Sequence, residues 1–152
     1  GSVHIGSRNL QEISEHWLRQ SCSALLHGDG LLAGDLAYNI HLDQRPNDWD
    51  AMDEVCELVG ISDLIKALPL GFATEIGEMG NIFSAGQRQR ILLARALYRK
   101  PEILVLDESL SHLDTEAALK ILNAIKQRGI STLLVTHNRE LINFCDAEFK
   151  MK

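Results

Sequence analysis

The sequence has no long apolar stretch and no N-terminal leader pattern. None of its apolar runs approaches the roughly 20 residues that a membrane-spanning helix needs. No cluster of basic residues followed by an apolar segment opens the chain, so we expect no signal peptide. With 45% hydrophobic and 24% charged residues among 152, the composition predicts one globular domain with a core of its own.

Cysteine and basic residues are scarce as well. Cys22, Cys56 and Cys145 are odd in number and widely spaced, which favours buried reduced thiols over a disulfide set. Neither they nor histidines such as His16 and His112 have the spacing of zinc ligands. Fifteen basic against twenty-one acidic residues give a formal net charge of −6, the opposite of a surface that coats nucleic acid. We therefore expect no nucleic-acid partner.

The loop G-x-x-x-x-G-K-[ST], which cradles nucleotide phosphates in many ATPases, does not occur in the 152 residues. Two stretches that are present nevertheless indicate phosphate chemistry. One is a glycine-containing helix start in the middle of the chain, and the other is an apolar strand that ends in two carboxylates. Together they predict half of an ATP site.

The helix start lies within Phe83–Arg90, and the helix is predicted to extend to about Arg99 and to be largely buried. Ser84 and Gln87 have the spacing of a capping box, which taken alone is the commoner explanation of this pattern. Gly86 costs a helix roughly 1 kcal/mol relative to alanine, a cost that makes sense if a ligand approaches the backbone closely. The free N–H groups and positive dipole end of such a turn favour a phosphate.

The carboxylates follow the apolar run Ile103–Leu106, which predicts a central parallel strand. Ligands of open α/β sheets bind at the carboxyl edge of the strands. This position favours Asp107 as a Mg²⁺ ligand acting through water and Glu108 as the group that polarises a water. A plain cap of the next turn is the alternative for Asp107. His137 ends the predicted central strand Ser131–Thr136 at the same edge, although a histidine there is more often a simple polar terminus.

The C-terminal half alternates strands with helices. Asp114 is a good N-cap for the amphipathic helix Thr115–Gln127, and a helix over Asn138–Phe144 follows the next strand. Ala147–Met151 is a further strand candidate. This alternation predicts an α/β fold with a doubly wound parallel sheet.

The first half is predicted to be mostly helical. Ser21–Leu26 predicts a short strand, whereas residues 36–82 are expected to contain helices and loops but no strand. Asp48 or Asp50 is expected to cap the first long helix there, and Ser62 the second.

Four stretches, taken in order, resemble the ATP-binding cassette (ABC) ATPases: Phe83–Arg90, Ile103–Glu108, Ser111–Asp114 and Thr136-His137. The resemblance implies a signature motif that binds the γ-phosphate of an ATP held by the opposite cassette, formed by Ser84, Ala85, Gly86 and Gln87. It further implies a Walker B strand ending in the Mg²⁺-binding Asp107, a catalytic Glu108, a D-loop ending in Asp114, and a switch histidine, His137.

The resemblance covers essentially the whole chain. It implies a partial P-loop NTPase core of parallel strands with a helical subdomain, in which residues 36–99 form the helical and signature subdomain. Residues 1–35 and 100–152 would belong to the RecA-like core. The antiparallel β-subdomain and the Walker A loop with its lysine are expected before Val3. We therefore expect the fragment alone to be inactive and to bind neither ATP nor Mg²⁺ tightly.

Two positions depart from the family pattern. His27 stands where the family has the Q-loop glutamine, in the stretch Leu26–Gly30. An imidazole can meet a metal-bound water but lacks the paired donor and acceptor of an amide. Ala85 replaces the more usual glycine of the signature motif, and its methyl group narrows the approach to a phosphate.

The run from Leu68 to Gly80, together with His112 in the D-loop, most resembles peptidase-containing exporters of the colicin V and bacteriocin type. This resemblance implies that the intact protein couples MgATP hydrolysis to export of a peptide or protein toxin. Its implied partners are a second cassette in a homodimeric ATP sandwich, the transmembrane domain of the same transporter and the exported cargo. The implied location is the cytoplasmic face of the bacterial inner membrane.

Two alternatives remain open at this stage. The chain could be a non-catalytic cassette remnant that complements a partner's ATP site, which His27 and the lack of a phosphate loop favour slightly. It could also be a chromosome-maintenance ABC ATPase, which the acidic balance and the lack of a long coiled-coil heptad disfavour.

Overall fold

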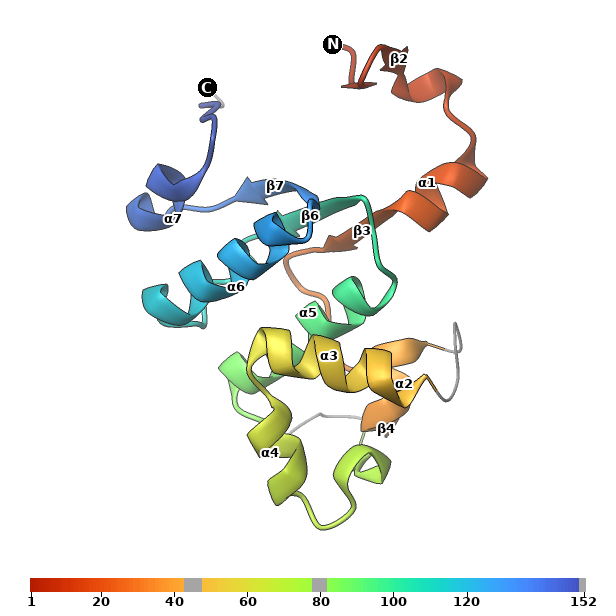
Figure 1. The fold of residues 1–152 in the computed structure, drawn as a ribbon, viewed down its shortest axis with the longest axis vertical. Helices are drawn as coiled ribbons and strands as arrows, with labels where there is room; N and C mark the ends of the chain where they lie inside the picture. Colours follow the sequence, from red (N-terminus) through yellow and green to blue (C-terminus); the bar gives the residue numbers. More distant parts are fainter. Residues whose placement is uncertain (43–47, 78–81, 151–152) are drawn as a thin grey trace.

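The computed structural model describes residues 1–42, 48–77 and 82–150. At its centre lies a parallel sheet of three strands, β3 (Cys22–Leu25), β6 (Ile103–Asp107) and β7 (Ser131–Val135), in the order β3-β6-β7. The register pairs Leu25 with Leu106 and Asp107 with Val135. All three strands therefore end at one edge of the sheet (Figure 1), and the expected parallel α/β architecture is confirmed.

The middle strand β6 is the best covered of the three. Leu104 and Leu106 are fully buried, because the side chains of a strand alternate between its two faces and these two point into the main core. β7 was expected to be a central strand as well, and this prediction is wrong for the described residues. There β7 pairs with β6 alone, its first three residues are exposed, and Leu133 is 58% exposed.

Helices α6 (Thr115–Gln127) and α7 (Arg139–Phe144) follow β6 and β7 and pack on one another (Figure 1). Asp114 caps α6 with a side-chain oxygen, as the sequence predicts, and Asn138, expected to be the first residue of its helix, is instead the N-cap of α7. Beyond α7 no strand forms over residues 147–150, so the prediction of a strand there is wrong, and Met151 lies outside the described residues.

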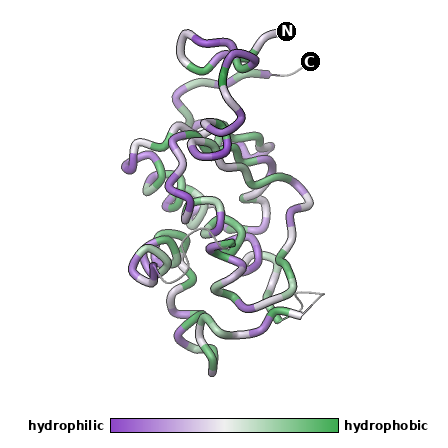
Figure 2. The backbone as a smooth tube through the Cα atoms, turned by 90° about the vertical axis from the view of Figure 1, so that its right-hand side faces the viewer, coloured by the Kyte–Doolittle hydropathy of each residue, from purple (hydrophilic) through white to green (hydrophobic). Residues whose placement is uncertain are grey.

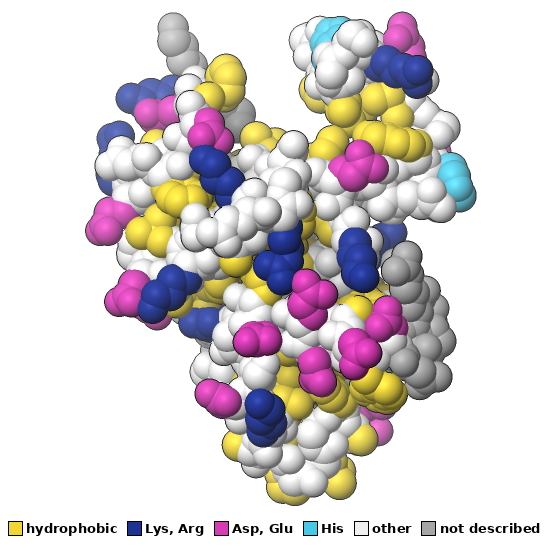
Figure 3. Space-filling view, in the orientation of Figure 1, with side chains coloured by type: hydrophobic (Ala, Val, Ile, Leu, Met, Phe, Trp, Pro, Cys, Tyr) yellow, Lys and Arg dark blue, Asp and Glu magenta, His cyan; other side chains and the backbone are white. Residues whose placement is uncertain are grey.

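A helical part gathers at the long helix α5 (Ala85–Tyr98): α2 (Leu36–His41) and α3 (Trp49–Val59) pack on α5, and α4 (Ser62–Ala67) packs on α3 (Figure 1). Asp48 caps α3, whose apolar side chains recur at helical spacing and are buried. Gly60 ends α3 at φ +73, and the Arg90 guanidinium donates to the Val59 carbonyl oxygen over 2.5 Å. The outer face of α3 carries a group of acidic side chains (Figure 3), in line with the net charge of −6.

Two expectations for the helical part are wrong. Ile61, not Ser62, is the N-cap of α4, and no side chain caps that helix. Residues 36–82 do contain a strand, because β5 (Glu75–Ile76) pairs antiparallel with β4 (Gly34–Asp35). Strands of two residues are too short to show any periodicity in a sequence, which is why the pattern did not predict them.

The N-terminal segment forms a hairpin of its own. β1 (His4–Ile5) pairs antiparallel with β2 (Arg8–Asn9), and a 3-10 turn over Leu10–Glu12 leads to α1 (Glu15–Ser21), which precedes β3. The hairpin is separate from the central sheet. Both ends of the chain lie at the same end of the molecule, opposite the helical part (Figures 1 and 2).

The three cysteines are free, but only Cys56 is buried. Cys22 is partly buried, and Cys145 is exposed because it lies at the end of α7, so the expectation of three buried thiols is wrong for Cys145. Within the described ranges no helix is long and apolar enough to cross a membrane.

Candidate functional site

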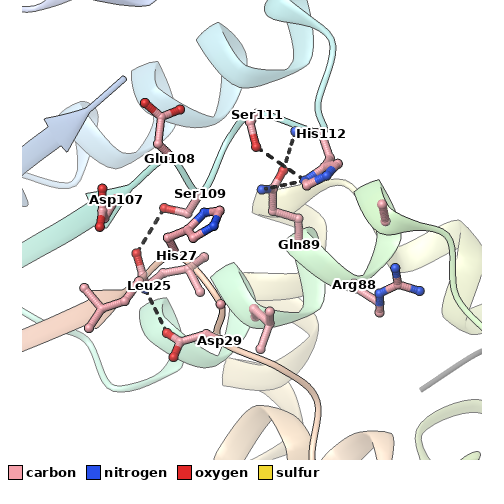
Figure 4. Close-up of a pocket in the computed structure, with 14 residues that line it drawn as sticks. Leu25, His27, Asp29, Arg88, Gln89, Asp107, Glu108, Ser109, Ser111 and His112 are labelled. Carbon is pink, nitrogen blue, oxygen red and sulfur yellow. Dashed lines mark hydrogen bonds between the residues drawn. The ribbon is translucent and has the colours of Figure 1, made fainter. Parts of the chain in front are cut away.

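A cavity of about 280 Å³ lies where three segments meet: the loop after β3, the start of α5 and the loop after β6 (Figure 4). Among the side chains that the sequence singles out, it brings together His27, Ala85, Asp107 and Glu108. Ser84, Gly86, Gln87, Asp114 and His137 do not line it. The carboxyl edge of the sheet and the start of α5 therefore border one space, but only part of the expected site faces it.

Glu108 has the most unusual geometry at this edge. Its backbone lies at φ +50, a conformation that L-residues rarely adopt, and its N–H donates to the Val135 carbonyl oxygen over 3.0 Å. Its Oε1 is buried and accepts no hydrogen bond from the residues that the structure describes. Residues held in such conformations cluster at functional sites. Such a buried carboxylate oxygen is free to accept a hydrogen bond from a bound water or from a ligand.

His137 lies beside this oxygen, with its Nε2 3.4 Å from Glu108 Oε1. The contact is too loose for a hydrogen bond, and an ion pair exists only when the imidazole is protonated. The His137 side chain is 97% exposed, so we assign the pair little energy of its own. The structure brings the two predicted catalytic residues together and leaves the imidazole open to solvent.

Asp107 is the last residue of β6 and lines the cavity next to Glu108. In the described ranges there is no group of three or more histidine, cysteine or acidic residues that could hold a metal ion. Mg²⁺ is commonly held by only one or two carboxylates, with water and substrate phosphates completing its octahedron. The position of Asp107 fits that mode of binding, and does not fit an ion held by protein ligands alone.

The start of α5 forms a complete capping box, as its spacing predicts. The Ser84 hydroxyl accepts from the Gln87 N–H over 3.2 Å, and Gln87 Oε1 accepts from the Ser84 N–H over 2.8 Å. A Cβ atom on Gly86 would lie 3.0 Å from the backbone oxygen of His112. In this structure the close approach at Gly86 is thus made by the chain itself, a reason for glycine that the local sequence pattern does not show.

The remaining predicted residues have clear local roles. His27 lies in a tight turn in which the Leu26 N–H donates to the Asp29 carboxylate over 2.8 Å, and its side chain lines the cavity. Asp114 accepts from the Ala117 N–H over 2.8 Å, so its Oδ1 caps α6. Its role toward a nucleotide stays a prediction.

Two residues of α5 that the sequence analysis did not single out connect the site to its surroundings. Gln89 contacts His112, in the loop after β6. Arg95 donates to the backbone and side-chain oxygens of Asn39, each over 2.7 Å, and to the Gly30 carbonyl oxygen over 3.1 Å. Burial lowers the pKa of Arg95, while Asp29 and Tyr38 raise it. The sequence held one signal for these two residues, since they are polar side chains on a helix that was predicted to be largely buried.

A scan against protein families supports this description. The family described as ABC transporter matches residues 1–111. This chain belongs to the ABC transporter family. The match confirms the resemblance inferred from the signature, Walker B and D-loop stretches.

Relatives include two secretion proteins of Escherichia coli, the probable microcin-H47 secretion/processing ATP-binding protein MchF and the colicin V secretion/processing ATP-binding protein CvaB. Each is 34% identical over 146 residues, covering 96% of this chain and 21% of the relative. The ABC multidrug transporter MDR5 of Trichophyton rubrum is 36% identical over 155 residues, covering 100% of this chain and 12% of the relative. The chain spans about a fifth or less of the length of these relatives.

A solved structure described as that of a bacterial Atm1-family ABC exporter with ATP bound has the same fold. It superposes with a TM-score of 0.84 at 28% identity and covers 93% of this chain and 25% of that chain. The chain therefore folds as part of an ABC cassette, as the sequence predicts.

Proposed function

We propose that this chain supplies the signature segment and the Walker B carboxylates of an exporter's ATP-hydrolysing cassette. Residues 36–99 would form its helical and signature subdomain, and residues 1–35 and 100–152 part of its RecA-like core. In the intact protein the cassette couples MgATP hydrolysis to transport across a membrane. It works as one of two cassettes that close on ATP, below the transmembrane domain of the same transporter and at the cytoplasmic face of the bacterial inner membrane.

One observation supports the assignment most strongly. Glu108 has a buried oxygen without a hydrogen-bond donor in the described part of the chain, and this oxygen lies on the sheet edge next to Asp107 and 3.4 Å from His137. Folding normally pairs buried polar atoms, so an exception at the carboxyl edge of a parallel sheet indicates a group prepared for a ligand.

Each residue has a separate task in the proposed site. The Glu108 carboxylate accepts a proton from the attacking water and orients it. Asp107 would hold Mg²⁺, which when bound would supply positive charge toward the transferred phosphoryl group. His137 donates from its exposed imidazole to a phosphate oxygen. The N–H groups at the start of α5 and the Ser84 hydroxyl donate to the γ-phosphate of an ATP held by the opposite cassette.

The 152 residues alone would neither hydrolyse ATP nor bind it tightly. The site offers two carboxylates, which are acceptors, and one donor, the histidine. The phosphates of ATP carry several negative charges and need hydrogen-bond donors or cations to hold them. Their usual cradle of backbone N–H groups and a lysine does not occur in this sequence. His27 in place of a glutamine removes one further amide from the site.

We propose a peptide or protein toxin as the cargo. This choice is supported by the similarity to the microcin and colicin V secretion proteins. It is also supported by the stretch Leu68–Gly80 and by His112. Residues 78–81 of that stretch lie outside the described residues. The multidrug transporters of similar identity define the competing cargo, a hydrophobic drug.

The test compares Glu108→Gln with Glu116→Gln in the full-length transporter that contains this segment. Glu116 is an exposed carboxylate on α6, paired with Lys120, so its substitution removes the same charge away from the cavity. We expect Glu108→Gln to lower the ATPase rate by at least about 100-fold while ATP-dependent dimerisation persists. Glu116→Gln should leave both unchanged. A wild-type rate in Glu108→Gln contradicts the proposed role of Glu108.

A second measurement addresses the cargo alone. A small peptide toxin should stimulate hydrolysis by the full-length transporter, and a hydrophobic drug should not. Stimulation by the drug only would overturn the cargo assignment and leave the ATPase assignment intact.

A further inference from the structure

The segment Ser109–Asp114 joins β6 to α6 and is anchored at both ends. At its start the buried Ser109 hydroxyl donates to the Leu25 carbonyl oxygen over 3.1 Å. At its end the Asp114 carboxylate accepts from the Ala117 N–H over 2.8 Å. In its middle the Ser111 and Leu113 N–H groups donate to the Glu108 and Leu110 carbonyl oxygens over 3.3 and 3.1 Å, whereas the His112 N–H contacts another element.

That contact is made by Gln89, a side chain of α5 that is 9% exposed (Figure 4). Gln89 Oε1 accepts from the backbone N–H of His112 over 3.0 Å, and Gln89 Nε2 lies 3.3 Å from His112 Nδ1. One turn earlier, the lack of a side chain at Gly86 allows the His112 carbonyl oxygen to approach α5. The loop is thus held at the backbone and at the ring of a single residue.

The chemistry of this contact determines the protonation of the ring. A backbone N–H only donates, so it requires the amide oxygen of Gln89 and turns the amide nitrogen toward the imidazole. That nitrogen only donates, so His112 Nδ1 has to accept from it. The Ser111 hydroxyl, 3.4 Å from the same Nδ1, can donate as well and is compatible with this orientation. The opposite orientation of the amide would oppose two donors at the backbone. The ring proton therefore belongs on Nε2.

We infer that Gln89 is a positioning residue that fixes residues 111–113 against α5 through His112 and selects the His112 tautomer protonated on Nε2. Ser111 and His112 line the same cavity as Glu108, so this contact fixes one wall of the candidate site. The consequence for ATP hydrolysis rests on the proposed function, whereas the contact and the tautomer do not depend on any nucleotide.

The test uses the ¹⁵N-labelled 152-residue chain and two substitutions of Gln89. Glu in place of Gln keeps the acceptor for the His112 N–H but presents a second acceptor to the ring. At about pH 8, where a free imidazole is neutral, ring ¹⁵N shifts should show Nδ1 unprotonated in the wild type and protonated in Gln89→Glu. An unprotonated Nδ1 in Gln89→Glu, or a protonated Nδ1 in the wild type, overturns the inference.

Leu in place of Gln removes both contacts at similar volume. The His112 amide proton should then exchange about tenfold faster, the change expected for loss of one ordinary hydrogen bond, and Gln89→Glu should restore its protection. The Ala117 amide, capped by Asp114, is the internal control and should keep its rate. If the His112 amide exchanges at an unchanged rate, or if the Ala117 amide exchanges faster by the same factor, Gln89 does not fix residues 111–113 locally. Should Gln89→Leu not fold, the wild type and Gln89→Glu decide the question.

Discussion

The helical part and the carboxyl edge of the sheet differ in whether a buried polar side-chain atom is hydrogen-bonded by the described residues. Asn39 is fully buried in α2, donates to the Leu32 and Asp35 carbonyl oxygens, and accepts from the Leu32 N–H and from Arg95. At the sheet edge, Glu108 has a buried oxygen that accepts no hydrogen bond from the described residues.

The difference separates two kinds of polar residue in one small chain. Where every donor and acceptor is satisfied internally, the side chains stabilise the fold, and their removal costs free energy of unfolding. Where one carboxylate oxygen is buried at a left-handed residue and accepts no hydrogen bond from the described residues, the fold gains little from it. Such a group is kept for a task outside the fold itself. Four predictions test this contrast, from the largest expected effect to the smallest.

The largest effect is expected for Arg95→Met. The substitution keeps most of the buried stem but removes three hydrogen bonds: the Asn39 backbone oxygen loses its Arg95 donor, and Asn39 Oδ1 keeps only the Leu32 N–H. The free energy of unfolding should fall by about 3 kcal/mol in urea denaturation. Arg19→Met is the matched control, since Arg19 forms an exposed pair with Glu15, and it should change stability by less than about 0.5 kcal/mol. Equal effects of the two substitutions would contradict the contrast.

A smaller difference is expected between Gly60→Ala and Gly129→Ala. Both glycines have positive φ, +73 and +71, so each alanine pays the same backbone strain of about 1 kcal/mol. At Gly60 the new Cβ would also lie 2.7 Å from Arg90 Nη1, whereas at Gly129 it meets nothing within 4 Å. Thermal unfolding should show the larger loss at Gly60, by about 1 kcal/mol. Equal losses would mean that the contact of Arg90 with the end of α3 contributes nothing.

At the sheet edge we expect a gain of stability. Glu108→Gly relieves the left-handed backbone and removes a buried oxygen without a partner, so the free energy of unfolding should rise by up to about 1 kcal/mol. Urea denaturation of the 152-residue chain measures the change. A loss of 2 kcal/mol or more would show that Glu108 stabilises the fold, and that the contrast with Asn39 is false.

The smallest effects on stability near neutral pH concern the thiols. Burial, with a smaller contribution from Asp53, raises the pKa of Cys56 from 9.0 to about 12. The folded state thus keeps this thiol protonated while the unfolded state ionises, so its contribution to stability is complete below pH 9 and is lost as pH rises toward about 12. Cys56→Ala should flatten that dependence. With a thiol reagent at neutral pH, Cys145 should react at once and Cys56 only after unfolding, and early labelling of Cys56 would contradict its burial.

The sequence predicted the long elements well, because their signals are local. Ser84 and Gln87 form the capping box that their spacing indicates, and Thr115–Gln127 is helical with the predicted bounds. The missed β4 and β5 are two residues long and depend on each other across about 40 positions, so no local pattern could indicate them. β7 has an apolar sequence but is an outer strand in the described sheet, since burial depends on neighbours that a sequence does not place.

For the candidate site, the sequence predicted which strand ends meet but not the contacts that surround them. The four ordered stretches predicted that Asp107, Glu108 and His137 end neighbouring strands, and the register of β6 and β7 brings them together. The role of Gly86 was not foreseen, because the atom nearest to it belongs to a loop 26 positions away. Contacts of that kind, including Gln89 with His112, follow from the packing of distant segments.

The central claim is that the carboxylates of this chain serve a nucleotide whose phosphates are held mainly by groups outside the 152 residues. Titration of the chain with a fluorescent ATP analogue in the presence of Mg²⁺ tests it most directly, alone and after mixing with a cassette that carries G-x-x-x-x-G-K-[ST]. We predict no saturable binding at micromolar concentrations by the chain alone, and binding only in the mixture, where the second cassette supplies the phosphate loop. Micromolar affinity of the chain alone would contradict the account.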